Sequence, residues 1–294
     1  MLRFGLSLLF FGFLIIQSSA QSLSKRIDSL TAGKPLTLGI SAVGIENSLD
    51  FHWNENKALP MQSVFKFPIA IKILSLVDDG TYSLESPIHI KEKELLENTW
   101  SPLKTKFTKG DVAISLGELI QYSVAQSDNN ACDILLRLAG GPLRTQTFIR
   151  NLGLKEFQIR YNEEQMHEDW SYQYENSASA KELSSLLKLF YEGKTLSETS
   201  TAYLYKVMLN TNTGQNKMKA FLPKGSTAHK TGSSGKNKEG ITGAENDIGI
   251  ITTPKNNHFT LSILISDSKL DEKTNTLLIA TISKWIYDYY ADHE

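Results

Sequence analysis

The chain has 294 residues, of which 40% are hydrophobic and 21% are charged. That composition is ordinary for a folded protein and supplies enough apolar side chains for a core. The formal net charge is −1. No excess of basic residues therefore points to a nucleic-acid partner or to an anionic membrane surface.

The first 20 residues have the features of a secretory signal peptide. Arg3 supplies a positive charge, the run from Leu6 to Ile16 is nearly all apolar, and small residues lead up to Ala20. We expect cleavage after Ala20 and a mature periplasmic chain without stable membrane association, beginning at Gln21. The alternative is a retained anchor, but the apolar run is shorter than the ~20 residues that span a bilayer.

Cys132 is the single cysteine, so the chain cannot form an internal disulfide. The residue lies in an apolar helical stretch, and no base is placed near it in the sequence. We therefore expect a buried small hydrophobic side chain and not a nucleophile.

Hydrophobic periodicity and turn residues predict the order of helices and strands. Two stretches, Ser86 to Gly110 and residues 157–178, are polar and show no clean period. The expected elements in chain order are two strands within Leu36 to Trp53, helices at Val64 to Val77, Ser115 to Leu138, Pro142 to Leu152, Ala180 to Tyr191 and Ser197 to Leu209, strands at Thr227 to Thr231, Asp247 to Thr253 and Phe259 to Ser266, and a last helix from Asp271 to Tyr290.

This order predicts a mixed α/β protein of two lobes. Residues 21–59 and 213–294, the two ends of the mature chain, are expected to share one sheet with flanking helices. Residues 60–212 are expected to form an all-helical lobe that carries the long loop 157–178. A cleft between lobes is a favoured place for a ligand.

Ser63 and Lys66 form the first candidate pair. A serine before an apolar helical run is most often a helix N-cap. Lys66 lies three residues on and hence on the same helix face. Its apolar neighbours Phe65, Phe67 and Pro68 would desolvate the ammonium group and lower its pKa, which makes a usable base. The alternative for Lys66 is a solvated surface lysine.

Two further tripeptides carry polar groups suited to the same chemistry. The first, Ser127-Asp128-Asn129, follows a predicted helix, where a hydroxyl could pass a proton to a leaving nitrogen and an amide could hold a substrate amide. Taken alone, it reads as a turn or a helix cap.

The second tripeptide, Lys230-Thr231-Gly232, lies on a predicted strand and is followed by Ser233. Small residues on an edge strand let a substrate lie against the backbone. A lysine and a threonine together suit a carboxylate, as charge and as hydrogen-bond donor. Alone, this triplet reads as the end of a strand.

Taken jointly, the three motifs resemble those of the penicillin-recognising serine enzymes, which include class A β-lactamases and penicillin-binding proteins. The resemblance covers the chain from about residue 25 to its end. It implies the two-lobe fold with an antiparallel sheet, a β-lactam substrate, a monomer, and neither metal nor cofactor.

Glu163 favours a class A β-lactamase within that group. Class A enzymes carry a glutamate on an omega-shaped loop, about three dozen residues after the Ser-Asp-Asn motif. Glu164 is the rival, and both could be solvated loop carboxylates. The segment from Asn162 to His167 resembles that of the PER and VEB branch, and this register favours Glu163.

The resemblance implies a role for each motif residue. Ser63 would attack the β-lactam carbonyl, with its own N–H and that of Ser233 as the oxyanion hole. Ser127 would pass a proton to the lactam nitrogen, and Glu163 would activate the deacylating water. Whether Lys66 or Glu163 is the base for acylation stays open.

The remaining candidates would bind the substrate. Lys230, Thr231 and Ser233 would hold its carboxylate beside Gly232, and Asn129 its side-chain amide. Trp100 resembles the aromatic residue at the rim of the cleft, with a core tryptophan as the alternative. Lys217 and Lys219 are both candidates for the extra cation that many members place near the carboxylate.

Several residues depart from the commonest class A pattern. His167 stands where an asparagine usually shares the catalytic water, as in the PER-like branch. Tyr161 and Asn176 replace the Arg–Asp salt bridge that pins the loop, and we expect Asp133 to brace Asn176 instead. The segment 236–243 is also longer than usual. The PER-like resemblance implies activity on bulky oximino cephalosporins.

Other functions share some of these features. A D-Ala-D-Ala carboxypeptidase uses the same motifs but lacks the loop glutamate, and a β-lactam sensor domain acylates without turnover. A serine-dependent glutaminase of the same fold is disfavoured by the predicted export. A metal-dependent hydrolase is disfavoured because no ligand spacing occurs among the six histidines, His52, His89, His167, His229, His258 and His293.

Overall fold

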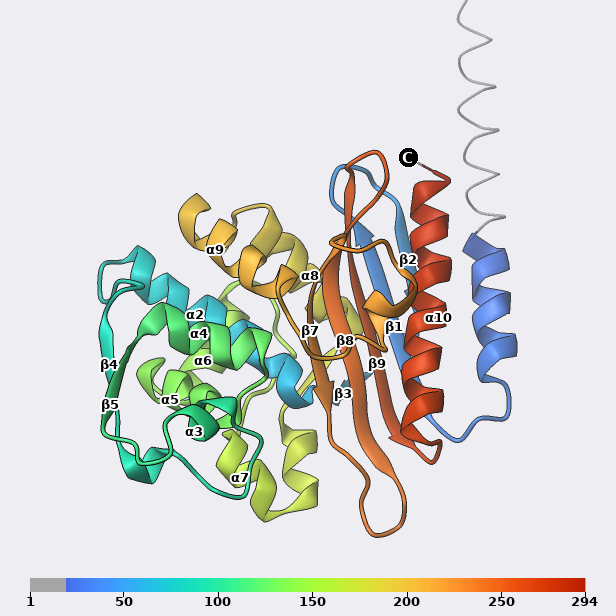
Figure 1. Ribbon diagram of the computed structural model, residues 1–294. Helices are drawn as coiled ribbons and strands as arrows, with labels where there is room; N and C mark the ends of the chain where they lie inside the picture. The colour runs from blue at the N-terminus through green and yellow to red at the C-terminus, as the bar shows by residue number, and fades with distance from the viewer. Residues whose placement is uncertain (1–19, 294) are drawn as a thin grey trace, which may run out of the picture.

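A five-stranded antiparallel sheet forms one half of the protein. The computed structural model describes residues 20–293, and Figure 1 shows the sheet packed beside a block of helices. The strand order is β2-β1-β9-β8-β7, so the two ends of the chain share the sheet as predicted. The strands are β1 (Thr37–Gly44), β2 (Asp50–Trp53), β7 (Thr227–Ser233), β8 (Thr242–Thr252) and β9 (His258–Ser268).

Alternate side chains of β9 face two different layers, as the two-residue period of a strand requires. Leu261, Ile263 and Ile265 belong to a core with α10 (Glu272–Ala291). A helix over residues 20–31 lies on this same side (Figure 1). The opposite face of the sheet packs on α8 (Ala180–Tyr191).

The helical half is built around α2 (Lys66–Asp78), which is buried along most of its length. Its apolar residues lie on every side, because helices surround it. The short helix just before it, η1 (Gln62–Phe65), packs against β7 of the sheet. The surrounding helices are α4 (Leu116–Ala125), α5 (Asn129–Leu138), α6 (Pro142–Asn151) and α9 (Glu198–Leu209).

Short elements join the longer helices and strands, and several of them occupy the two stretches in which the sequence shows no period. Two of them lie in residues 157–178, which are therefore more regular than a simple loop. These elements are β3 (Ala58–Pro60), η1 (Gln62–Phe65), β4 (Pro87–Ile90), η2 (Glu92–Glu94), α3 (Pro102–Lys106), β5 (Val112–Ser115), α7 (Glu163–Glu168), η3 (Trp170–Glu175), β6 (Ser177–Ser179) and η4 (Met218–Phe221).

The longer helices and strands predicted from the sequence are present, while the short strands β4, β5 and β6 within residues 60–212 were not predicted. The helix at residues 20–31 was not predicted, and β8 begins at Thr242 where the sequence predicted Asp247. The predicted signal peptide lies outside the described residues except for Ala20. Within residues 20–293, none of the helices has the length and apolar character that crossing a bilayer requires. The lobe boundaries at residues 59 and 212 stay predictions.

Candidate active site

Lys66 connects three groups at the junction of the two halves. Its Nζ atom donates to Ser63 Oγ at 2.5 Å, to Asn129 Oδ1 at 2.8 Å, and to a Glu163 carboxylate oxygen. An ammonium group has three protons, so these contacts use all of them. The side chain is fully buried, which rules out a solvated surface lysine.

Ser63 lies on η1, one turn before α2, and its hydroxyl does not cap the helix. Neither η1 nor α2 has a side-chain hydrogen bond at its N-cap. The alternative reading of Ser63 as a helix N-cap is therefore wrong, and its hydroxyl is not used by the helix start. The preceding residue, Gln62, has a left-handed φ of 46°, and such strained backbone is common next to reactive groups.

Glu163 is held by the N-terminus of α7. Asn162 caps this helix, and its side chain accepts from Gln165 N at 2.9 Å. Asp133, on α5, accepts from the backbone N–H of Glu163 at 2.7 Å and of Glu164 at 3.0 Å. Glu163 is only 3% exposed, whereas Glu164 is exposed to solvent. Of the two rivals, Glu163 is the one that reaches Lys66.

Burial, together with the nearby Glu163 charge, raises the pKa of Asp133 to about 7. The two N–H donors of α7 act in the opposite direction. Asp133 therefore titrates near neutral pH, and it is hydrogen-bonded to the backbone of the catalytic candidate Glu163.

The prediction that Asp133 braces Asn176 is wrong. Asn176 Oδ1 accepts from Arg160 N at 2.7 Å and from Tyr161 N at 3.0 Å, and its Nδ2 donates to Tyr161 O at 2.8 Å. The Tyr161 ring stacks on Tyr172 at 4.3 Å. The Asp133 carboxylate is hydrogen-bonded to α7 instead. The loop is therefore held by the Asn176 amide and by the stacked rings of Tyr161 and Tyr172.

Ser127 faces the same junction from the turn between α4 and α5. Its φ is 58°, a left-handed conformation that non-glycine residues rarely adopt and that must be stabilised by its surroundings. Lys230 Nζ donates to Ser127 Oγ at 2.9 Å and to Thr231 O at 2.8 Å. Desolvation, together with the positive charges of Lys66 and Lys217, depresses the pKa of Lys230 well below its usual value.

The other two residues of this motif, Asp128 and Asn129, hold the surrounding chain. Asp128 caps α5 by accepting from Ala131 N, and it also accepts from Leu103 N at 2.6 Å. Asn129 donates to Thr99 Oγ1 at 2.7 Å while its Oδ1 accepts from Lys66. In this motif, Ser127 is a candidate proton carrier, Asp128 is the N-cap of α5, and Asn129 links Lys66 to Thr99.

Gly232 lets strand β7 approach η1 closely. A Cβ atom at this position would lie 2.6 Å from Met61 O and 3.1 Å from Ser63 N, and the first distance is shorter than van der Waals contact allows. Thr231 and Thr213 share a hydroxyl–hydroxyl hydrogen bond of 2.8 Å. The third motif thus lies directly beside the candidate nucleophile.

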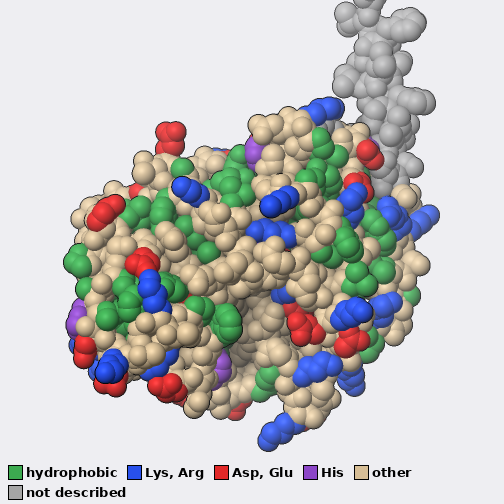
Figure 2. All heavy atoms as spheres, in the orientation of Figure 1, with side chains coloured by type: hydrophobic (Ala, Val, Ile, Leu, Met, Phe, Trp, Pro, Cys, Tyr) green, Lys and Arg blue, Asp and Glu red, His purple; other side chains and the backbone are tan. Residues whose placement is uncertain are grey.

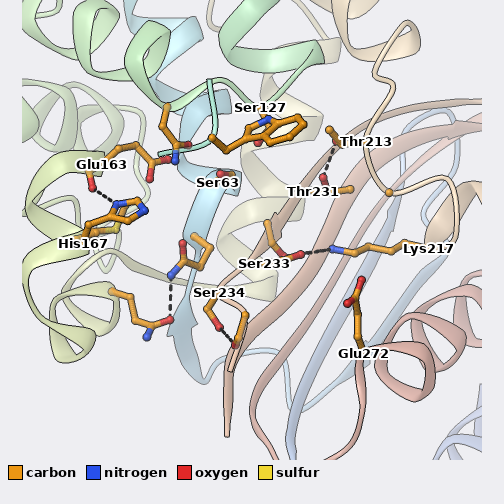
Figure 3. Close-up of a pocket in the computed structure, with 18 of the residues that line it drawn as sticks. Ser63, Ser127, Glu163, His167, Thr213, Lys217, Thr231, Ser233, Ser234 and Glu272 are labelled. Carbon is orange, nitrogen blue, oxygen red and sulfur yellow. Dashed lines mark hydrogen bonds between the residues drawn. The ribbon is translucent and has the colours of Figure 1, made fainter. Parts of the chain in front are cut away.

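A cleft of about 720 Å³ lies between the two halves, within the size range of small-molecule sites. The hollow in the surface is visible in Figure 2, and Figure 3 shows Ser63, Ser127 and Glu163 on one side with Thr231, Ser233 and Lys217 on the other. The sequence did not identify several lining residues, namely Gln62, Met166, Trp170, Gln173, Thr213, Gly214, Asn216, Ser234, Gly235 and Glu272.

Two predicted cleft residues lie at its edge. Trp100 is 63% exposed and donates from its ring nitrogen to Gln126 O at 2.9 Å, so it is a rim residue and not a core tryptophan. His167 lines the cleft, and its Nδ1 lies 2.7 Å from Glu163 O. This contact can hold the imidazole beside the glutamate.

The structure separates the two lysines that were candidates for the extra cation. Lys217 lines the cleft and donates to Ser233 Oγ at 2.9 Å. Lys219 donates to the backbone oxygens of Leu209 and Thr211. Lys217 is therefore the one beside Ser233, at the edge that we expect to bind a carboxylate.

Cys132 is fully buried, as expected. Burial raises the pKa of its thiol well above the usual value, so the reactive thiolate form is suppressed.

Comparisons with known proteins agree with this geometry. Residues 22–290 match the β-lactamase enzyme family. The chain is 38% identical to the extended-spectrum β-lactamase PER-1 of Pseudomonas aeruginosa, over 96% of this chain and 92% of that protein. It is also 38% identical to β-lactamase VEB-1 of the same organism, over 98% and 97% of the two chains.

A solved structure is also similar along its whole length. The crystal structure of the extended-spectrum β-lactamase TLA-3 superposes with a TM-score of 0.91 at 40% identity, covering 92% of this chain and 99% of TLA-3. The family match, the identities and the fold lead to one conclusion: the chain belongs to the class A β-lactamases, near the PER and VEB enzymes.

Proposed function

We propose that this β-lactamase opens penicillins and cephalosporins through an acyl-enzyme on Ser63, which water activated by Glu163 then hydrolyses. The observation that carries the proposal is the continuous contact from Ser63 Oγ through Lys66 Nζ to the Glu163 carboxylate. A buried carboxylate beside a nucleophile can accept a proton from water in a general-base step. Either Lys66 or Glu163 would serve as the base of acylation.

The other motif residues have roles in the same reaction. As Ser63 attacks, negative charge develops on the carbonyl oxygen, and the backbone N–H groups of Ser63 and Ser233 would stabilise it. The lactam nitrogen needs a proton when its bond to carbon breaks, and Ser127 would deliver it. Lys230 supports this role, since it donates to Ser127 Oγ and would lower the cost of a transient alkoxide.

Substrate binding would use both walls of the cleft. Lys230 and Thr231 would hold the substrate carboxylate beside Gly232. Asn129 would hold the side-chain amide. Trp100 at the rim and His167 beside Glu163 would bound the space for the acyl side chain.

The spectrum would include bulky oximino cephalosporins. Two similar proteins, PER-1 and TLA-3, carry the words extended-spectrum in their names. In this chain the loop that bears Glu163 is pinned through Asn176 and not through an ion pair. A ratio of kcat/KM for an oximino cephalosporin to that for a simple cephalosporin within about tenfold of unity would support this spectrum, and a ratio below about 0.001 would contradict it.

The protein would act as a periplasmic monomer after loss of residues 1–20, with no bound cofactor. The basis is the signal-peptide pattern of the N-terminus. Mass spectrometry of the periplasmic protein should give Gln21 as its first residue, and a full-length membrane-bound product would contradict the proposal.

The central experiment compares Glu163→Gln with its neighbour Glu164→Gln on a chromogenic cephalosporin. The first variant should give one stoichiometric burst and then a steady rate at least ~100-fold below that of the wild type, because the general base for deacylation is removed. The second should turn over normally, since Glu164 is exposed. A burst followed by a stall in the wild type would instead indicate a penicillin-binding or sensor protein.

A further inference from the structure

A second buried ion pair lies behind the edge of the cleft that would bind the substrate carboxylate. Lys217 Nζ and Glu245 Oε1 are 2.5 Å apart, and their side chains are 4% and 5% exposed. Glu245 lies on β8 directly across from Ser233 on β7. Figure 3 shows Lys217 reaching Ser233 from the side away from Ser63.

The hydrogen bonds of Lys217 leave nothing for a substrate. An ammonium group has three protons. Four acceptors surround this one, namely Glu245 Oε1 at 2.5 Å, Ser233 Oγ at 2.9 Å, Asn246 O at 3.1 Å and Gly232 O at 3.3 Å. The charge of Lys217 is also balanced by that of Glu245. Lys217 therefore offers a bound anion neither a free proton nor an uncompensated charge.

The hydroxyl of Ser233 is committed in the same way. It has one proton, which it donates to Glu245 Oε1 at 2.6 Å, while it accepts from Lys217. A carboxylate accepts hydrogen bonds and cannot donate one. To bind a substrate carboxylate, Ser233 would have to turn its proton from one carboxylate to another, exchanging one charge-assisted hydrogen bond for a similar one.

The neighbouring hydroxyl differs. Thr231 Oγ1 pairs with the Thr213 hydroxyl at 2.8 Å, and a hydroxyl can both donate and accept. Thr231 can turn its proton to a substrate while it accepts from Thr213. It then exchanges a neutral hydrogen bond for a charge-assisted one, which is roughly twice as strong.

We propose that Glu245 is a specificity-determining residue that competes with the substrate carboxylate for the Ser233 proton. Carboxylate recognition then rests on Lys230 and Thr231, while Ser233 contributes its backbone N–H and little from its hydroxyl. This inference rests on the proposed function, in which the anionic group of a β-lactam lies at this edge.

The test measures the preference for a free acid. A chromogenic cephalosporin and its methyl ester, which lacks the anionic group, are compared by the ratio of their kcat/KM values. The Thr231→Val variant should lower this ratio by about tenfold or more, since it removes a charge-assisted hydrogen bond. The Ser233→Ala variant keeps the backbone N–H and should change the ratio less than about twofold. The change is small because the Ser233 hydroxyl would gain no net hydrogen-bond energy from the substrate carboxylate.

Replacing Glu245 should release the Ser233 proton. In Glu245→Gln the amide can donate to Ser233, so the ratio should rise several-fold. Adding Ser233→Ala to this variant should remove the part of the rise that comes from the Ser233 proton and leave the part that comes from the uncompensated charge of Lys217; this non-additivity marks a direct interaction between Glu245 and Ser233. A purely structural role for Glu245 would change the kcat/KM of acid and ester equally.

Two results would overturn the inference. The first is a fall of about tenfold in the acid-to-ester ratio for Ser233→Ala alone. The second is an unchanged or lowered ratio for a folded Glu245→Gln protein. If that variant does not fold, the comparison of Ser233→Ala with Thr231→Val decides the matter. Failure of the wild type to hydrolyse either compound would count against the proposed function, a different outcome.

Discussion

The cleft has a buried lysine–glutamate pair on each side, and the two pairs differ in what else the lysine contacts. On the helical side, Lys66 joins Glu163 to the hydroxyl of Ser63. On the sheet side, Lys217 joins Glu245 to the hydroxyl of Ser233. Both pairs are almost free of solvent, so removal of one partner would leave an uncompensated buried charge.

The difference lies in the hydrogen-bond geometry around each lysine. Lys66 has as many acceptors as protons, and two of them are the side chains expected to exchange protons during the reaction. Lys217 has two backbone oxygens among its four acceptors, which no reaction can change. A buried lysine–glutamate pair can therefore take part in proton transfer at one position and hold the shape of a candidate binding edge at another.

Removing Lys66 should give the largest effect. In Lys66→Met the carboxylate of Glu163 stays buried without its partner, so we expect a loss of about 3–5 kcal/mol in the free energy of unfolding. Acylation should slow by at least ~100-fold, because both candidate bases are disturbed. Single-turnover kinetics and denaturant unfolding measure the two effects.

Lys72→Met is the matched control for this variant. It lies on the same helix, and its ammonium group is 4.9 Å from the Phe148 ring with only partial burial. Its rate should stay within about twofold of the wild type, and its unfolding free energy within ~1 kcal/mol. An equal fall in acylation rate for both lysine variants would show that any lysine replacement in α2 slows acylation, and would contradict a specific role for Lys66.

Removing Lys217 should harm stability more than chemistry. Lys217→Met leaves Glu245 buried and unpaired, which costs about 3–5 kcal/mol in the free energy of unfolding. The double variant Lys217→Met with Glu245→Gln removes both charges and should recover most of that loss. The kcat of the double variant should stay within about tenfold of the wild-type value, a small change beside the ~100-fold expected at Lys66.

Lys219→Met provides the comparison for Lys217. Lys219 is half-buried, donates only to backbone oxygens among the described residues, and has its pKa lowered by burial. Its loss leaves no buried carboxylate without a partner, so we expect a smaller change in stability than for Lys217. If Lys219→Met is as unstable as Lys217→Met, buried charge pairing is not what distinguishes the sheet-side pair.

The sequence predicted one of these pairs and missed the other, for a physical reason. Ser63 and Lys66 are three residues apart, and helical geometry alone places them on one face. Glu163 was reached through its family motif. Glu245 has neither signal, because its contact with Ser233 depends on the register of two strands. Patterns within one element are visible in a sequence, while pairings between elements are not.

The early start of β8 has the same origin. Glu245, Asn246 and Asp247 are all buried, but three polar residues in a row break the alternation that marks a strand. Asn246 instead donates to Pro60 O and Met61 O, next to the candidate nucleophile Ser63. These polar residues made the start of the strand unrecognisable in the sequence, and they lie along the candidate substrate-binding edge.

Helix α7 and the Asp133 contact were also beyond the sequence. Six residues are too few to show a helical period. Asp133 was expected at Asn176, yet it caps α7 instead, because two free N–H groups at a helix start are strong competitors for a carboxylate. The residues of the site were largely predictable, and the contacts that hold Glu163 in place were not.

Asp133 gives the smallest effect and a pH dependence of defined sign. Burial raises its pKa from 3.8 to about 7 in the folded protein, so the folded state binds a proton more tightly than the unfolded state. The contribution of this group to stability is therefore fully present below about pH 4 and is lost as pH rises through 7. Asp133→Asn cannot titrate, and its amide oxygen can still accept from α7.

Thermal unfolding between pH 5 and pH 8 measures this difference directly. The wild type should become less stable relative to Asp133→Asn as the pH rises, because ionisation of a half-buried carboxyl near Glu163 costs free energy. Activity should change less than at either lysine pair, since Asp133 holds only the backbone of α7. Parallel stability profiles for the two proteins would mean that the carboxyl does not titrate in this range, and would leave the two cleft pairs as the groups that set the pH response.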